Sequence, residues 1–136
     1  IPPRIQDFIR EHHGLHLTRY QYGRAVEMHR NDPETLDAEL FRYPGPKPRS
    51  KETGILMLAD ISEARARSKP PHNDEELRDL LKIIVDNLIK DGSLENTSLS
   101  LRDLALIQES FHHTLMNTYH PRIQYPEDRL TTTANP

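Results

Sequence analysis

The chain has 136 residues and a net charge of -3 with both signs mixed, which excludes a basic surface for a nucleic acid polymer or an anionic membrane. It contains no cysteine, which excludes disulfides and thiolate metal sites. No run of about 18 apolar residues occurs, so we expect no direct insertion into a membrane. The length fits one domain, but a hydrophobic content of 35% is low for a self-sufficient globular protein. Because the sequence begins with Ile1 rather than Met, we expect it to derive from a longer protein.

Two short helices are expected in the first third of the chain. Pro2 and Pro3 suit the first turn of a helix. Apolar residues and one histidine then follow at helical spacing: Ile5, Phe8, Ile9 and His12. Gly14 can end this helix, and a second helix is predicted over residues 16–30. Residues 41–48 contain three prolines and one glycine, which predicts an extended loop.

Three longer helices are expected in the remainder of the chain. Ser50 is a suitable N-cap for a helix that runs to about Ser68. Its apolar residues point almost all round, which predicts a central, buried helix. Asn73 and Glu76 resemble a capping box at the start of the next helix, which Asp91-Gly92 ends.

The last helix is expected to begin at Ser100, which with Asp103 forms its N-terminal cap, and to end before Pro121. Residues 126–136 are polar and are expected to form a disordered tail. Because no segment predicts a strand convincingly, the expected fold class is all-α.

The adjacent histidines His12 and His13 are the first candidate site. Successive helical residues point about 100° apart, so both rings can converge on one cation only where the last turn opens. Imidazole binds Zn, Fe, Mn and similar cations. The alternative is a structural pair that bonds the last carbonyls of the helix.

Asp60 is the second candidate, because it lies in residues 55–61, the most apolar stretch of the chain. A lone buried carboxylate is costly unless it is paired or binds a metal. The alternative is a place at the helix edge with a salt bridge to an arginine. Glu63 and Arg67 have the spacing of a separate ion pair.

Two cations of the proline-rich loop, Arg42 and Lys47, are candidate contacts for a substrate phosphate, although simple solvation is the alternative. For the pair His112-His113 we favour a solvent-facing position. The other histidines are expected to be surface residues: His16, His29, His72 and His120. The sequence contains no Ser-His-Asp order, Walker loop or glycine-rich fingerprint.

Several motifs together resemble the C-terminal part of the HD domains of seven-transmembrane bacterial HD proteins. They are residues 9–14 (IREHHG), 41–48 (FRYPGPKP), 57–60 (MLAD), 91–94 (DGSL), 101–104 (LRDL) and 120–123 (HPRI). The resemblance covers nearly the whole chain. It implies an HD-domain-like helical bundle over residues 1–125 that is incomplete and holds only the C-terminal helices.

The resemblance also implies a metal-dependent phosphodiesterase that hydrolyses a cyclic dinucleotide, cyclic di-AMP in this family. His12 and His13 would bind one metal ion of a dimetal centre and Asp60 the other, with Mn or Fe as the expected metals. The paired ions would activate a water molecule and polarise the phosphodiester. The family carries a first histidine, a His-Asp doublet and a further histidine ahead of the matched region, and this sequence has no His-Asp dipeptide. We therefore expect the isolated chain to be inactive, to hold little metal, and to need the missing N-terminal part of its HD domain as a partner.

In the family, the catalytic domain lies on the cytoplasmic side of a membrane anchor, which implies a cytoplasmic location as the intracellular region of a membrane protein. Two other functions remain open: a non-catalytic regulatory or interaction module on an HD scaffold, and an HD phosphohydrolase for another nucleotide. Helices without their packing partners expose apolar surface, so exchange of helices in a homo-oligomer is a further alternative.

Overall fold

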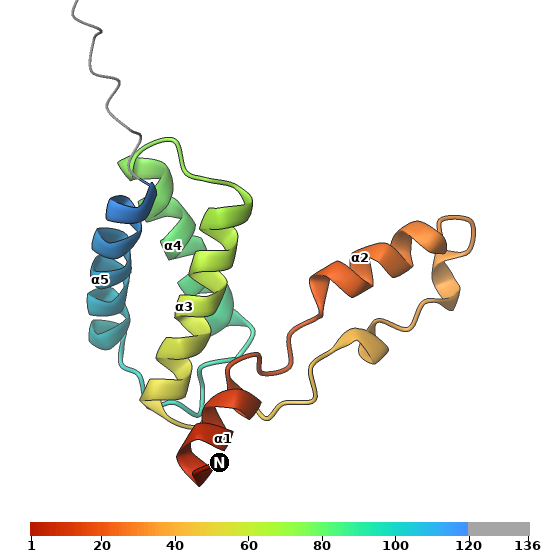
Figure 1. Cartoon of the computed structure of the whole chain (residues 1–136), viewed down its shortest axis with the longest axis horizontal. Helices are drawn as coiled ribbons and strands as arrows, with labels where there is room; N and C mark the ends of the chain where they lie inside the picture. Colours follow the sequence, from red (N-terminus) through yellow and green to blue (C-terminus); the bar gives the residue numbers. More distant parts are fainter. Residues whose placement is uncertain (120–136) are drawn as a thin grey trace, which may run out of the picture.

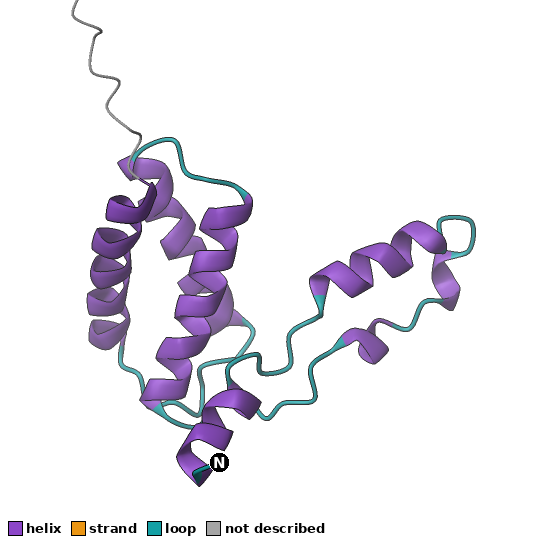
Figure 2. Ribbon diagram, viewed as in Figure 1, coloured by secondary structure: helices purple, strands orange, loops and turns teal. Residues whose placement is uncertain are grey.

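The computed structural model describes residues 1–119, and in this part every regular element is a helix (Figure 2). Three long helices, α3, α4 and α5, lie against one another as a bundle, and α1 packs against α3 (Figure 1). The elements in chain order are α1 (Pro3–Glu11), α2 (Arg19–Met28), η1 (Pro33–Thr35), η2 (Ala38–Phe41), α3 (Lys51–Ser68), α4 (Asp74–Lys90) and α5 (Leu101–Tyr119). The all-α prediction is confirmed.

Local capping signals begin α3 and α5 where the sequence predicts. Ser50 and Thr53 bond each other reciprocally: the Thr53 N–H donates to Ser50 Oγ at 3.2 Å, and the Ser50 N–H donates to Thr53 Oγ1 at 3.3 Å. Ser100 and Asp103 form the same arrangement, with N–H···O distances of 2.9 and 3.0 Å. Each pair satisfies backbone donors that the first turn of a helix leaves unbonded.

The predicted start of α4 is correct, but its predicted capping box and the predicted ends of α1 and α2 are not. At the start of α4, Asn73 Oδ1 accepts from the Glu76 N–H at 2.8 Å, but the Glu76 carboxylate bonds the His72 N–H instead of closing the predicted capping box. Helix α1 ends at Glu11, before the histidine pair, and α2 begins at Arg19 and ends at Met28. The predicted helix end at Pro121 and the predicted tail of residues 126–136 lie outside the described residues.

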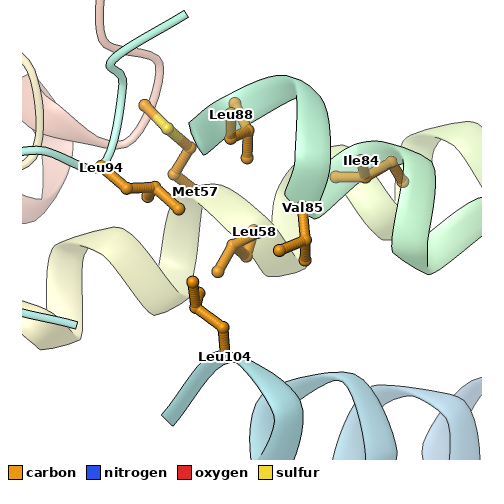
Figure 3. Packing of buried hydrophobic residues seen from close by; sticks show 7 residues of the cluster. All are labelled: Met57, Leu58, Ile84, Val85, Leu88, Leu94 and Leu104. Carbon is orange, nitrogen blue, oxygen red and sulfur yellow. The ribbon is translucent and has the colours of Figure 1, made fainter. Parts of the chain in front are cut away.

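The core lies between α3, α4 and α5. Its main cluster comes from these helices and the loop between α4 and α5 (Figure 3): Met57, Leu58, Ile84, Val85, Leu88, Leu94 and Leu104. A second cluster joins the other ends of α4 and α5: Leu77, Leu81 and Leu115. Burial of such a side chain stabilises the fold by about 1.5–3 kcal/mol, so these residues hold the bundle together.

The predicted central position of α3 is confirmed, because this helix contacts α1, α4 and α5, but the prediction that it is buried is only partly correct for the described chain. Ile55 and Leu56 are 36% and 38% exposed, and the Asp60 side chain is 48% exposed. The faces of α3 that α1, α4 and α5 cover carry Met57 and Leu58 as well as small and polar residues. The apolar run of the sequence is thus wider than the surface that these neighbouring helices cover.

Residues 19–41 form an arm that projects from the bundle (Figure 1). Its base is a short antiparallel neck, in which the Thr18 N–H donates to Phe41 O at 2.6 Å and the Tyr43 N–H donates to His16 O at 2.9 Å. No residue of α2 is buried in the described structure. The proline-rich segment then returns to α3 without regular structure, as predicted, and its Gly45-Pro46 bond is cis.

Among the helices of residues 1–119, none has both the length and the apolar character required to cross a bilayer.

Candidate metal centre

The histidine pair lies in the turn that follows α1. His12 is the C-cap residue, and the chain then turns at Gly14, whose φ is +53°. The Gly14 N–H donates to Glu11 O at 2.9 Å, and this turn brings the rings of His12 and His13 side by side, with centroids 3.8 Å apart. The two rings thus lie next to each other at the end of α1.

Asp60 of α3 faces this pair. Its Oδ2 lies 3.6 Å from Nδ1 of His13, so the described partner of Asp60 is a histidine rather than an arginine. Tyr43 of the proline-rich loop stacks on the ring of His13. The two ring centroids lie 4.1 Å apart, and the angle between the ring planes is 17°. Glu63 and Arg67 pair with each other at 3.0 Å, as predicted.

The ring of His12 is oriented by the helix that precedes it. Its Nδ1 lies 2.8 Å from Phe8 O. Because a carbonyl oxygen only accepts hydrogen bonds, Nδ1 carries the proton and Nε2 keeps the lone pair that binds a metal. Metal-binding histidines commonly donate their other ring N–H in this way. The bond to a late carbonyl of α1 is also what the structural alternative predicts, so this contact alone fits both interpretations.

The surroundings of His13 favour its neutral form. Burial lowers the pKa of His13, and the adjacent His12 lowers it further, while the carboxylate of Asp60 acts in the opposite direction. A neutral imidazole is the form that binds metal ions.

These side chains fit a part of a metal centre rather than a complete one. In residues 1–119, no group of three or more histidine, cysteine, aspartate or glutamate side chains lies close enough to hold a metal ion by itself. His12, His13 and Asp60 nonetheless combine imidazole nitrogens with a carboxylate oxygen, a set of donor atoms that suits divalent metal ions.

Glu11, which the sequence analysis did not single out, is buried directly beside the histidine pair, with 2% of its surface exposed. It accepts hydrogen bonds from the Arg49 N–H at 2.9 Å, the Arg49 Nε at 2.8 Å and the Thr53 hydroxyl at 2.8 Å. Burial alone would raise the pKa of Glu11, but these bonds outweigh it and hold the pKa below its usual range. The sequence signal that could have predicted the burial of Glu11 is its position three residues after Phe8, on the inward side of α1.

A cleft of about 890 Å³ opens beside the histidine pair, between the arm, α3 and α4. His13 and Asp60 form part of its wall, and three arginines from different segments line it: Arg19, Arg42 and Arg65. The side of α4 contributes an apolar surface through Leu80, Ile83 and Ile84. Its volume falls within the range of about 300–1,000 Å³ that is typical of ligand sites.

The two predicted phosphate contacts occupy different positions. Arg42 lines the cleft and donates to Leu15 O at 3.2 Å and to Glu39 at 2.7 Å. Lys47 is not part of the cleft wall; its Nζ pairs with Glu95 Oε1 at 2.9 Å.

Two other histidines differ in position from the prediction. His16 is a cleft residue rather than a plain surface residue, and its Nε2 lies 3.2 Å from Ser93 Oγ and 3.6 Å from Asp91 Oδ2. His112 is 12% exposed and pairs with Asp74, whereas His113 is exposed. His120 lies outside the described residues.

No family model matches the chain, but curated and solved proteins do. The chain is 36% identical over 126 residues to the cyclic-di-AMP phosphodiesterase PgpH of Bacillus subtilis, across 93% of the chain and 17% of that protein. It is 32% identical to PgpH of Listeria monocytogenes, across 95% of the chain and again 17% of that protein. The chain thus spans about one sixth of the length of these relatives.

The crystal structure of the L. monocytogenes PgpH HD domain in complex with cyclic di-AMP has the same fold. It matches with a TM-score of 0.76 and 30% sequence identity, over 92% of this chain and 57% of that chain. The fold and the sequence similarity together show that the chain is homologous to part of an HD domain. The homologous domain is that of PgpH, whose solved structure it also matches.

Proposed function

We propose that the chain forms part of the HD domain of a metal-dependent phosphodiesterase that hydrolyses a cyclic dinucleotide, with cyclic di-AMP as the expected substrate. The observation that carries the proposal is the contact of His13 with Asp60, beside His12, at the wall of a cleft of about 890 Å³. The name of the PgpH relatives and the cyclic di-AMP bound to the L. monocytogenes domain support this choice of substrate.

In this proposal His12 and His13 hold one divalent cation and Asp60 holds the second. Held by these residues, divalent cations would lower the pKa of a water molecule and polarise the phosphodiester. The remaining ligands come from a part of the HD domain that this chain does not include. Residues 1–125 belong to that domain. The domain lies on the cytoplasmic side of a membrane anchor.

The cleft provides contacts for the substrate. Arg42 binds a phosphate oxygen, for which its guanidinium is suited by geometry and permanent charge. The apolar side of α4, with Leu80 and Ile83, packs against a base. A role for Lys47 requires that its ion pair with Glu95 opens, because this pair directs the ammonium group away from the cleft wall.

Hydrolysis of cyclic di-AMP by the full-length protein with Mn²⁺ tests the proposal. His12→Ala and Asp60→Asn should each lower kcat/KM by more than about 100-fold, since removal of a ligand exceeds the ~10–100-fold effect of its supporting contacts. His113→Ala, at an exposed position on α5, is the matched control and should have no effect. A metal-loaded protein that leaves cyclic di-AMP intact, with His12→Ala binding Mn²⁺ as well as the wild type, would contradict the proposal.

A second candidate is a non-catalytic module on the HD scaffold, with which the incomplete ligand set within residues 1–119 is equally compatible. Under this alternative the full-length protein binds a cyclic dinucleotide but does not hydrolyse it with any divalent metal. A panel of nucleotides in the same assay separates both candidates from an HD phosphohydrolase of different specificity.

A further inference from the structure

Glu11 is fully bonded inside the protein. Its Oε1 accepts from the Arg49 guanidinium, and its Oε2 accepts from both the Arg49 N–H and the Thr53 hydroxyl. An apolar residue of similar volume would bury this position without any desolvation cost. A carboxylate with three directed bonds instead fixes one arrangement of the segments that it joins.

These bonds connect the segments that build the candidate metal centre. Glu11 is the last residue of α1 and directly precedes the histidine pair. Thr53 lies in the first turn of α3, the helix that also carries Asp60. Arg49 directly follows the proline-rich loop, which carries Tyr43, the residue whose ring stacks on His13. The buried carboxylate of Glu11 therefore links three segments: the end of α1 next to the histidine pair, the helix that contains Asp60, and the loop that contains Tyr43.

We propose that Glu11 is a positioning residue, which sets the place of His12 and His13 relative to Asp60 without touching substrate or metal. The inference rests on the proposed function and adds a role for a residue that the function does not use directly. The structure favours Glu11 over other residues for this positioning role, because Glu11 directly precedes the histidine pair and makes all three bonds itself.

The test uses Glu11→Gln in the full-length protein. Glutamine has nearly the same shape, but its amide nitrogen cannot accept from the donors of Arg49 or Thr53. In the metal-free protein with histidine-selective isotope labelling, the ring protons of His13 should move away from the shifts that stacking on Tyr43 imposes. The affinity for Mn²⁺ should fall about tenfold, the lower end of the effect of supporting contacts.

Asp74→Asn is the matched control. It removes the ion pair of Asp74 with Arg78 within α4 and the one with His112, which joins α4 to α5 away from the histidine pair. It should leave the His13 ring shifts and the Mn²⁺ affinity unchanged even where it lowers the melting temperature, which separates a positioning role from a general loss of stability.

A folded Glu11→Gln protein with wild-type ring shifts and wild-type Mn²⁺ affinity overturns the proposal. Should Glu11→Gln fail to fold, Arg49→Gln decides, because this side chain is 58% exposed and the bond from the Arg49 N–H remains. A ring shift in the same direction supports the positioning role, and an unchanged ring overturns it. Failure of the wild type to bind Mn²⁺ and to hydrolyse cyclic dinucleotides contradicts the proposed function instead, and the ring shifts of the metal-free protein still decide the role of Glu11.

Discussion

Gly14 is the residue on which the turn after the histidine pair depends. Its φ of +53° lies in the left-handed region, which residues with a Cβ adopt at a cost of roughly 1–2 kcal/mol. A Cβ added there would also lie 2.8 Å from Cε of Met57, a core residue with no exposed surface. Backbone conformation and core packing thus both favour glycine directly after His12 and His13.

Gly14→Ala is therefore expected to lower the free energy of unfolding by roughly 1–2 kcal/mol, and to weaken Mn²⁺ binding because the histidine pair must shift. Urea unfolding and metal titration measure the two effects. Gly23→Ala is the matched control, since nothing lies within 4 Å of the added Cβ. Alanine is the better helix former, so Gly23→Ala should be neutral or stabilising. Equal stability of both variants would contradict this account of the turn.

At the scale of the elements, α5 depends on the cap at its N-terminus. The Ser100 N–H, the ammonium of Lys51 and the Ser100 hydroxyl all donate to Asp103 and lower its pKa from 3.8 to about 2. Because the pKa of the folded state is depressed, this carboxylate stabilises the fold above pH ~4. The contribution is lost as the pH falls through about 2.

Asp103→Asn should accordingly have a lower melting temperature than the wild type at neutral pH, with a difference that closes as the pH falls from about 4 towards 2. Thermal melts at a series of pH values measure it. Glu63→Gln, which removes an exposed ion pair on α3, should show a much smaller difference at neutral pH. If the difference in melting temperature between Asp103→Asn and the wild type persists below pH ~2, the cap is not its source.

Elements that depend on local signals could be predicted from the sequence. Features that depend on contacts between distant segments could not. Serine caps and the proline-rich loop act within a few residues, so the starts of α3 and α5 were predictable. The exposure of Asp60 was not predictable, because exposure on a helix depends on which other helices cover it. The network of Glu11 was also out of reach, since its partner Arg49 lies 38 residues away in the chain. The contact of His13 with Asp60 was expected from a family resemblance rather than from spacing.

At the scale of the whole molecule, stability is divided between the bundle and the arm. The bundle contains the buried clusters of α3, α4 and α5, whereas α2 contains no buried residue in the described structure. Segments with few buried apolar contacts open at a lower free energy than the core. The arm nevertheless supplies Arg19 and Tyr22 to the cleft wall, so part of this wall belongs to the less stable portion.

Hydrogen exchange should show this division directly. Amides of α2 should exchange at least ~10-fold faster than those of α4 between Leu81 and Leu88, the segment that packs in the core. A cyclic dinucleotide that binds in the cleft should slow exchange in α2 and leave α4 nearly unchanged. Equal protection of both helices in the free protein would show that the arm is held by contacts other than those of the described chain.

The antiparallel neck has a consequence for how such a site can diversify. The neck pairs Leu17, which follows His13 by four residues, with Arg42, which directly precedes Tyr43. This pairing at the base of the arm fixes the distance between the stacked rings of His13 and Tyr43. Residues 29–37, at the tip, lie on the far side of the neck from those rings. Exposed loop tips accept insertions more readily than other segments. Evolution can therefore lengthen or rebuild the tip, and with it the extent of the arm beside the cleft, while the histidine pair and Asp60 keep their spacing.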